Sequence, residues 1–224
     1  MPVHPALDRP TAGTREEVVR WVLRDRAVAV VRTDAPDRLV ETAQALQVGG
    51  VVCVEVTMTV PGAIEGIRAV AEAMRGSVLV GAGSVTDAAT ARAAVEAGAR
   101  YVVSPVFKRE VVEAAHALDA AAMPGCFTPT EILAAHEAGA DVVKVFPAGA
   151  LGVGYLKSVL APLPHLRLMP TGGVTVENAA DWLRAGAVAV GVGSDLVETA
   201  AVAAGDWRRL TENARRLRAA VDAA

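Results

Sequence analysis

The stretch DVVKVFP, residues 141–147, places Lys144 in the middle of an apolar run. The run is short, rich in β-branched residues and closed by a proline, which predicts a buried parallel strand rather than a helix. An ammonium group is costly to bury in such a strand. The cost falls if the amine is held neutral, and a neutral buried amine is also the nucleophile of Schiff-base chemistry. The alternative is a lysine whose stem is buried while its amine reaches water or pairs with a carboxylate.

Short Val-rich runs like this one recur along the chain and alternate with longer, Ala-rich amphipathic stretches. Because no Pro-, Gly- or Ser-rich linker divides them, the pattern predicts one α/β domain over residues 1–224, with parallel strands joined by helices. Eight strands are the number that closes a barrel, so we predict a single (β/α)8 TIM barrel over about residues 27–197. The predicted strands are residues 27–32, 51–58, 79–84, 101–106, 121–127, 141–147, 167–172 and 187–194.

Helix-start signals support this arrangement. The stretch TPTE, residues 128–131, combines a capping threonine, a proline at the first helical position and a glutamate at the third, which predicts a helix start. Thr14 and Glu17 have the same spacing, so we expect an additional N-terminal helix over about residues 14–25. A C-terminal amphipathic helix is expected over about residues 206–222.

A doubly wound sheet is the alternative architecture. Such a sheet usually carries a nucleotide-binding motif after its first strand. The chain has no Gly-x-Gly-x-x-Gly at that place and no Walker lysine motif. The barrel is therefore the preferred prediction.

The composition is that of an ordinary globular chain. It has 224 residues, 53% of them hydrophobic, and a formal net charge of -3, a mild acidity that argues against a nucleic-acid partner. We find no secretory leader and no run of about 18 apolar residues, so we expect no membrane span and a cytoplasmic location. The two cysteines lie in apolar runs, which fits a reducing compartment. None of the histidines has metal-ligand spacing, so no metal site is expected.

Polar residues fall at the carboxyl ends of the predicted strands, where a barrel of this kind builds its site. On the second strand, alternation puts Glu55 and Thr57 on one face. A carboxylate among valines is costly unless it meets a cation or moves a proton. Lys144 is the candidate cation, and a plain buried ion pair is the structural alternative. Arg32 ends the first strand and could hold a carboxylate or phosphate, or could face solvent.

Glycines mark three further strand ends. The stretch GAGS, residues 81–84, leaves room for a ligand beside Ser84, although glycines that pack a barrel interior would look the same. The last two strands end in PTGG, residues 170–173, and GVGS, residues 191–194. Glycines there let backbone amides approach an anion, and these two loops are the usual phosphate site of the fold. We therefore predict a phosphate site at Gly172, Gly173, Gly193 and Ser194.

Together these motifs resemble the 2-keto-3-deoxy-6-phosphogluconate (KDPG) aldolase family, which includes 4-hydroxy-2-oxoglutarate (KHG) aldolases. The resemblance runs from about residue 27 to residue 197, with the motifs in order on the expected strands. It implies a class I aldolase that uses no metal and no separate cofactor, because the substrate forms a covalent Schiff base with Lys144. The motifs are EVTMTVP (55–61), GAGS (81–84), SP (104–105), PG (124–125), KVFP (144–147), PTGGV (170–174) and GVGS (191–194).

The resemblance also implies roles for the matching residues. Lys144 matches the Schiff-base lysine and Glu55 the general acid and base, which agrees with the chemistry, because a protonated imine is an electron sink and one carboxylate can move the protons. Some members carry an arginine where this chain has Thr59, so the anion-binding role falls to Arg32. Gly172, Gly173, Gly193 and Ser194 would cradle a terminal phosphate. The other implied substrate contacts are Thr57, Ser84 (often threonine in the family), Pro105, Phe146 against the imine and Thr171.

The implied reaction is cleavage of KDPG to pyruvate and glyceraldehyde 3-phosphate, with KHG as a further substrate. The galactonate epimer, KDPGal, is an alternative substrate. The resemblance also implies a homotrimer and a place in the Entner–Doudoroff pathway. Two functions of other classes remain open: a phosphosugar epimerase or isomerase that uses Lys144 and Glu55 for proton transfer only, and a non-catalytic barrel that senses a phosphorylated ligand.

Overall fold

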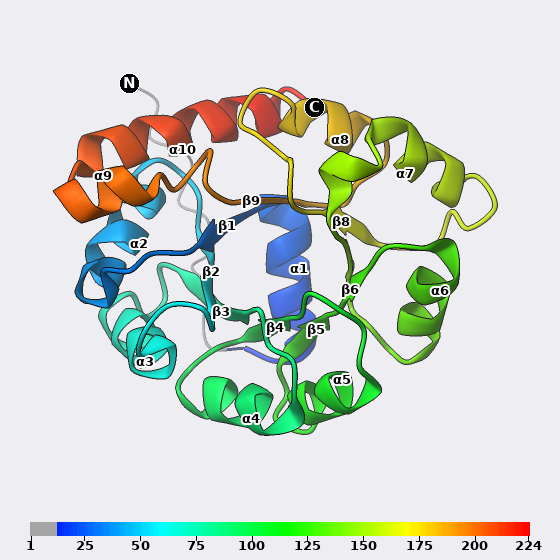
Figure 1. The fold of residues 1–224 in the computed structure, drawn as a ribbon, viewed down its shortest axis with the longest axis horizontal. Helices are drawn as coiled ribbons and strands as arrows, with labels where there is room; N and C mark the ends of the chain where they lie inside the picture. The colour runs from blue at the N-terminus through cyan, green and yellow to red at the C-terminus, as the bar shows by residue number, and fades with distance from the viewer. Residues whose placement is uncertain (1–12) are drawn as a thin grey trace.

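The computed structural model describes residues 13–224; the first twelve residues of the predicted domain lie outside the described part. The chain has an α/β fold in which the strands pair in parallel. Six strands form one sheet, in the order β5-β4-β3-β2-β1-β9, and three form a second, in the order β6-β7-β8. Figure 1 shows the strands around a common centre, with most of the helices outside them.

The strands are short and nearly all of their residues are buried, which suits parallel strands that are covered on both faces. Their bounds are β1 Ala27–Val31, β2 Cys53–Thr57, β3 Leu79–Gly83, β4 Tyr101–Val103, β5 Ala121–Met123, β6 Gly125–Cys126, β7 Val143–Val145, β8 Leu168–Pro170 and β9 Val190–Val192.

Helices alternate with the strands, and two short 3-10 turns interrupt the alternation. The bounds are α1 Arg15–Asp25, η1 Pro36–Arg38, α2 Leu39–Val48, α3 Ala63–Ala73, α4 Ala88–Glu96, α5 Arg109–His116, α6 Pro129–Glu137, η2 Ala148–Ala150, α7 Val153–Leu160, α8 Ala179–Arg184, α9 Thr199–Ala204 and α10 Trp207–Asp222.

Both capping boxes expected from the sequence are present. The hydroxyls of Thr14 and Thr128 accept from the backbone N–H groups of Glu17 and Glu131, and each glutamate side chain accepts from the threonine N–H in return. These bonds satisfy amides that have no partner inside a helix, so α1 and α6 each begin at the next residue. Glycines with positive φ follow several of the helices, at Gly50, Gly76, Gly98, Gly139 and Gly186.

One predicted strand is wrong as a continuous element. Residues 121–127 are divided into β5 and β6, with Pro124 between them. Proline has no N–H to donate, so it interrupts the ladder on one side. Its carbonyl still accepts from the N–H of Lys144 at 2.9 Å. The break leaves β5 and β6 at the edges of different sheets, while the other ends of the two sheets meet at a single bridge between Thr171 and Gly191.

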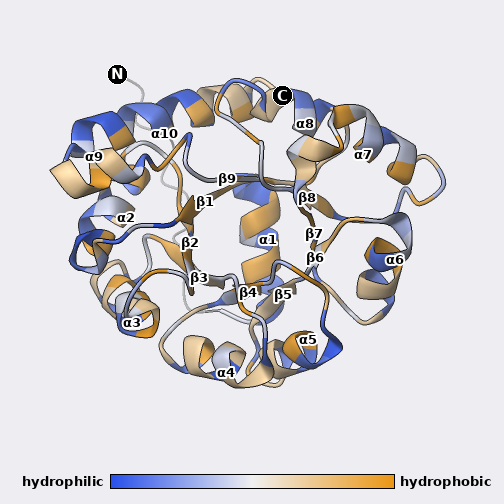
Figure 2. Cartoon of the chain, viewed as in Figure 1, coloured by the Kyte–Doolittle hydropathy of each residue, from blue (hydrophilic) through white to orange (hydrophobic). Residues whose placement is uncertain are grey.

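Two apolar clusters form the core. The larger packs the outer helices against the strands. The smaller joins α1, through residues such as Val22, to the first residues of several strands, among them Cys53, Leu79 and Tyr101. α1 therefore covers the amino-terminal ends of the strands, which leaves their carboxyl ends free to build a site. Figure 2 shows the strands coloured mainly as hydrophobic and α10 as a mixture of hydrophilic and hydrophobic positions.

α10 is an outer helix of the fold. Its buried residues include Leu210, Leu217 and Val221, and it packs against α2 and α8. Within residues 13–224, none of the helices combines the length and apolar character needed to cross a membrane.

Candidate active site

A cavity of about 590 Å³ opens at the carboxyl ends of the strands. Its lining comes from β1, β2 and β7 and from segments that follow β1, β3, β4, β7, β8 and β9. Every one of the site residues predicted from the sequence lines this cavity, so the fold brings together positions that are far apart along the chain. They are Arg32, Glu55, Thr57, Ser84, Pro105, Lys144, Phe146, Thr171, Gly172, Gly173, Gly193 and Ser194.

Lys144 lies in the middle of β7 and is 5% exposed. Its backbone is fixed from both sides, because β7 pairs it with Gly125 of β6 and Met169 of β8. The Nζ atom lies 5.0 Å from the centre of the Phe146 ring, a distance at which a ring face attracts a cation. The amine is thus held at the cavity by a rigid strand and an aromatic neighbour.

Glu55 lies on β2 and is 1% exposed. Gly83 on the neighbouring strand makes room for it, because a Cβ at that position would collide with the Glu55 carboxylate. Neither carboxylate oxygen has a hydrogen-bond partner among residues 13–224. Burial raises the pKa of Glu55, and the positive charges of Lys144 and Arg32 partly offset the rise. A carboxyl with a raised pKa is suited to both give and take a proton near neutral pH.

Arg32 and Thr57 occupy the side of the cavity built by β1 and β2. Arg32 follows β1 and is exposed, so its charge is at the mouth rather than in the interior. Thr57 is buried; its hydroxyl donates to the carbonyl of Val31 at 3.2 Å and lies 2.8 Å from the hydroxyl of Thr59. These bonds hold the Thr57 side chain in place as part of the cavity wall.

Thr171 and Ser84 supply the other hydroxyl groups predicted for the site. The Oγ1 atom of Thr171 is sealed from solvent and has no hydrogen-bond partner among the described residues. Gly191 on β9 leaves the space that this side chain occupies. Ser84 follows β3 with a φ of 59°, an uncommon left-handed conformation for a residue with a side chain. Such strain is most common at functional sites, where the surrounding structure imposes it.

The loop after β8 requires glycine at two positions. Gly172 and Gly173 have φ angles of 78° and 83°, a region that costs glycine nothing. A Cβ on Gly173 would also lie 2.6 Å from the Cα of Gly149 in η2. Conformation and close packing therefore both select glycine here.

Six backbone amides at this end of the cavity, in two short runs of residues, are available to a ligand. Within the described part of the chain, no backbone acceptor or side-chain acceptor is recorded for their N–H groups. Clustered free amides form an anion-binding concavity. The amides belong to Gly172, Gly173, Val174, Gly193, Ser194 and Asp195.

Six residues of the lining were not predicted from the sequence. Most of them directly follow the glycine motifs, and this adjacency is the only signal that could have found them. Asp195 is the notable one, because it places a carboxylate beside the predicted phosphate site. The six are Val30, Val174, Thr175, Asp195, Val197 and Thr199.

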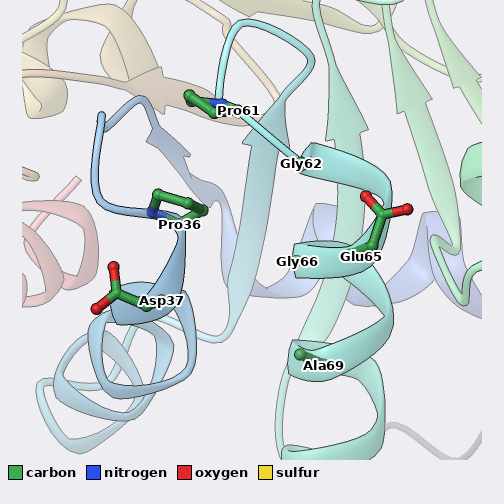
Figure 3. A pocket seen from close by; sticks show the side chains of 7 residues that line it. All are labelled: Pro36, Asp37, Pro61, Gly62, Glu65, Gly66 and Ala69. Atoms are coloured by element: carbon green, nitrogen blue, oxygen red, sulfur yellow. The ribbon is translucent and has the colours of Figure 1, made fainter.

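A second, more open hollow of about 450 Å³ lies between η1 and the start of α3. Figure 3 shows Asp37 and Glu65 on opposite sides of it, with Pro36 on the side of η1 and Pro61 on the segment that leads into α3. Its lining contains no lysine, arginine or hydroxyl group, so the first cavity is the candidate site. No group of three or more potential metal ligands occurs in residues 13–224.

Comparison with known proteins agrees with the resemblance seen in the sequence. The model of the KDPG and KHG aldolase family matches residues 19–213. A 2-dehydro-3-deoxy-phosphogluconate aldolase of Treponema pallidum is 39% identical over 191 residues, which cover 84% of this chain and 90% of that protein. A 2-dehydro-3-deoxy-6-phosphogalactonate aldolase of Escherichia coli is 34% identical over 179 residues, which cover 80% of this chain and 87% of that protein.

A solved structure is similar over nearly the whole fold. It is the KDPG aldolase of Legionella pneumophila with pyruvate captured as a covalent carbinolamine, and it matches with a TM-score of 0.83 and 27% identity over 92% of this chain and 98% of that one. With a family model that spans most of the chain and relatives above 30% identity, the conclusion is direct: the chain belongs to the KDPG and KHG aldolase family.

Proposed function

We propose that this chain is a class I aldolase that cleaves KDPG to pyruvate and glyceraldehyde 3-phosphate, with Lys144 as the Schiff-base residue. One observation supports this most strongly: a buried lysine amine, a buried carboxylate without partners and a cluster of free amides line the same cavity. The family supplies the lyase chemistry. The geometry supplies one group for each step of it.

In the first stage, the neutral amine of Lys144 attacks the C2 carbonyl of the keto acid. Glu55 gives a proton to the carbonyl oxygen, and the carbinolamine loses water to form a protonated imine. The Phe146 ring packs beside the Lys144 amine and covers the positively charged imine. Thr171 and Ser84 bind the C1 carboxylate of the substrate. The reaction needs neither a metal nor a separate cofactor, because the imine formed in this stage withdraws the electrons in the next.

In the second stage, the bond between C3 and C4 breaks. Glu55, directly or through one water, takes the proton of the C4 hydroxyl, and the electrons of the broken bond move into the imine to give an enamine. The aldehyde leaves. Glu55 then returns its proton to C3, and water hydrolyses the resulting pyruvate imine to release pyruvate and regenerate the Lys144 amine.

The distal end of the substrate carries the phosphate, which we place at the free amides of the two glycine motifs. Backbone amides that already point at the ligand bind an oxyanion without reorganisation. Arg32 at the cavity mouth adds a permanent positive charge for the anionic groups. We expect phosphorylated substrates to be preferred, because losing these contacts would cost several kcal/mol.

KDPGal is the second candidate substrate. The similarity to the Escherichia coli 2-dehydro-3-deoxy-6-phosphogalactonate aldolase favours it. The two sugars differ at C4, where the bond breaks, so the comparison of kcat/KM for KDPG, KDPGal and KHG decides among them. Release of pyruvate from none of the three would contradict the proposal and leave a ligand-sensing role.

Borohydride reduction in the presence of pyruvate tests the covalent step. We expect a stable adduct that peptide mapping assigns to Lys144. Lys144→Arg keeps the charge but lacks the nucleophile, so it should give no adduct, while Lys157→Arg on α7 is the matched control and should trap like the wild type. Turnover of a phosphosugar without any trapped adduct would instead indicate an epimerase or isomerase that uses Lys144 only for proton transfer.

We further propose that the two sheets are parts of one (β/α)8 barrel in a single domain. β5 and β6 follow one another around Pro124, and the bridge between Thr171 and Gly191 joins β8 to β9. We also propose that the chain acts in the Entner–Doudoroff pathway of the cytoplasm as a homotrimer. Light scattering tests the assembly, and a mass three times that of one chain is expected.

A further inference from the structure

The anion-binding amides belong to two loops, which we call the β8 loop, residues 171–176, and the β9 loop, residues 193–197. The β9 loop is fixed internally by its own backbone, whereas the β8 loop is fixed by neighbouring segments. In the β9 loop, the carbonyl of Gly193 accepts from Leu196 and Val197 at 2.9 Å each. This turn leaves the preceding amides of Ser194 and Asp195 free.

The β8 loop is held by hydrogen bonds from η2 and from Asn178. The N–H groups of Ala148 and Gly149 in η2 donate to the carbonyls of Thr171 and Gly172 at 2.9 and 2.7 Å. The side-chain amide of Asn178 donates to the carbonyl of Gly173 at 3.0 Å. These bonds use the carbonyls of residues 171–173, and the N–H groups of residues 172–174 stay free for a ligand.

One side chain joins the two loops. The carboxylate of Asp195 accepts from the backbone N–H of Val176 at 2.7 Å, and it is the one side-chain hydrogen bond recorded between residues 171–176 and 193–197. The loops follow different strands, and the nearest backbone link is the bridge between Thr171 and Gly191 at their base. The relative position of the two sets of amides beyond that bridge depends on this contact.

Asp195 places a negative charge beside the predicted phosphate site, and this position needs an explanation. A carboxylate at the rim of an anion site repels the ligand, so electrostatics alone would not favour it there. The short bond to Val176 offers a reason, because a charged acceptor makes a stronger hydrogen bond to an amide than a neutral one. We infer that Asp195 is a positioning residue that holds the β8 and β9 loops at the spacing a phosphate requires and so sets the preference for phosphorylated substrates.

This inference rests on the proposed aldolase function, and a pair of substitutions separates the hydrogen bond from the charge. Asp195→Asn keeps an acceptor for Val176, and Asp195→Ala removes it, while both remove the charge. We expect kcat/KM for KDPG to be about tenfold higher in Asp195→Asn than in Asp195→Ala, which corresponds to about 1.4 kcal/mol. The difference should lie in KM, and unphosphorylated 2-keto-3-deoxygluconate should show less than a twofold difference.

Asp87 provides the matched control pair. Its carboxylate also accepts from a backbone N–H, that of Thr90 at 2.8 Å, but it caps α4 outside the cavity lining. Asp87→Asn and Asp87→Ala should therefore differ in stability only, with equal ratios of kcat/KM for the two substrates.

Calorimetric titration with inorganic phosphate makes the comparison without turnover. Asp195→Asn should bind phosphate about tenfold more tightly than Asp195→Ala. Equal affinities, or equal losses on phosphorylated and unphosphorylated substrates, would overturn the positioning role. Failure of the aldolase proposal would show separately, as a wild-type protein that traps no pyruvate.

Discussion

The carboxylate of Glu55 occupies space that exists only because a neighbouring residue has no side chain. Gly83 lies opposite Thr57 in the parallel register of β2 and β3, and its missing side chain is replaced by the Glu55 carboxylate. The GAGS motif, which could equally have been simple interior packing, thus creates space for a candidate catalytic group. The neighbouring Gly81 does the same for the ring of Tyr101.

Substitution of Glu55 by glutamine should remove the proton carrier while preserving its shape. We expect kcat to fall by about 10² to 10⁴-fold, the usual contribution of a positioned acid or base. Because Glu55 first gives a proton in the proposed reaction and burial raises its pKa, the wild-type kcat/KM should fall as the pH rises through that raised value. The pH profile of kcat/KM checks this, and a glutamine variant with an unchanged rate would contradict the assigned role.

Gly83→Ala should damage the site through steric conflict. The new Cβ collides with the Glu55 carboxylate, and overpacking of this kind costs about 1–3 kcal/mol. We expect lower kcat together with a lower free energy of unfolding in urea. Gly154→Ala in α7 is the control, since a Cβ there meets nothing within 4 Å, and it should leave both activity and stability intact or slightly improve stability.

At the scale of elements, the end of α1 is tied to α10 by a buried ion pair. Arg218 donates to the backbone carbonyl of Asp25 at 2.7 Å and to its carboxylate at 3.3 Å, across 193 positions of sequence. The second carboxylate oxygen is sealed and has no partner among residues 13–224. Burial raises the pKa of Asp25 to about 6, although the charge of Arg218 opposes the rise.

This pair gives a pH-dependent stability with a definite sign. The folded state binds the Asp25 proton more tightly than the unfolded chain does, so this stabilisation is complete below the ordinary pKa of aspartate and is lost as the pH rises through about 6. The loss amounts to about 3 kcal/mol. Asp25→Asn should therefore gain in unfolding free energy, relative to wild type, between pH 4 and pH 7. Urea unfolding across this range measures it, with Asp222→Asn, which alters the exposed partner of Arg218, as the control; parallel curves for wild type and Asp25→Asn would contradict it.

At the scale of the whole molecule, the two ends of the strands have different roles, and this difference is the main organising feature. α1 and the smaller apolar cluster fill the amino-terminal ends, and the cavity opens at the carboxyl ends. Tyr101 belongs to the smaller cluster and is fully buried, with a hydroxyl that has no hydrogen-bond partner among the described residues. The interior at the amino-terminal ends of the strands is therefore closely packed, but one of its polar groups, the Tyr101 hydroxyl, has no hydrogen-bond partner among the described residues.

Tyr101→Phe should consequently stabilise the fold. Removing a buried hydroxyl without a partner recovers its desolvation penalty, about 1 kcal/mol, and leaves the packing of the ring unchanged. Chemical unfolding measures the gain. A loss of stability would mean that the hydroxyl makes a bond that holds the interior together.

Local patterns in the sequence, together with the family resemblance, predicted the parallel strands, the helix starts at the two threonine caps and 12 of the 18 residues that line the cavity. They could do so because side-chain alternation, capping and glycine turns act over a few neighbouring residues. The tertiary structure alone decided which groups meet: the space at Gly83 for Glu55, the bond from Val176 to Asp195 and the pair of Asp25 with Arg218. These contacts depend on strand register and on helices far apart in the chain, and no local pattern carries that information. The lysine in the middle of DVVKVFP and the carboxylate of Glu55 were both identified from the sequence, whereas the lack of a hydrogen-bond partner for Glu55 among residues 13–224 became apparent only when the strands were placed side by side.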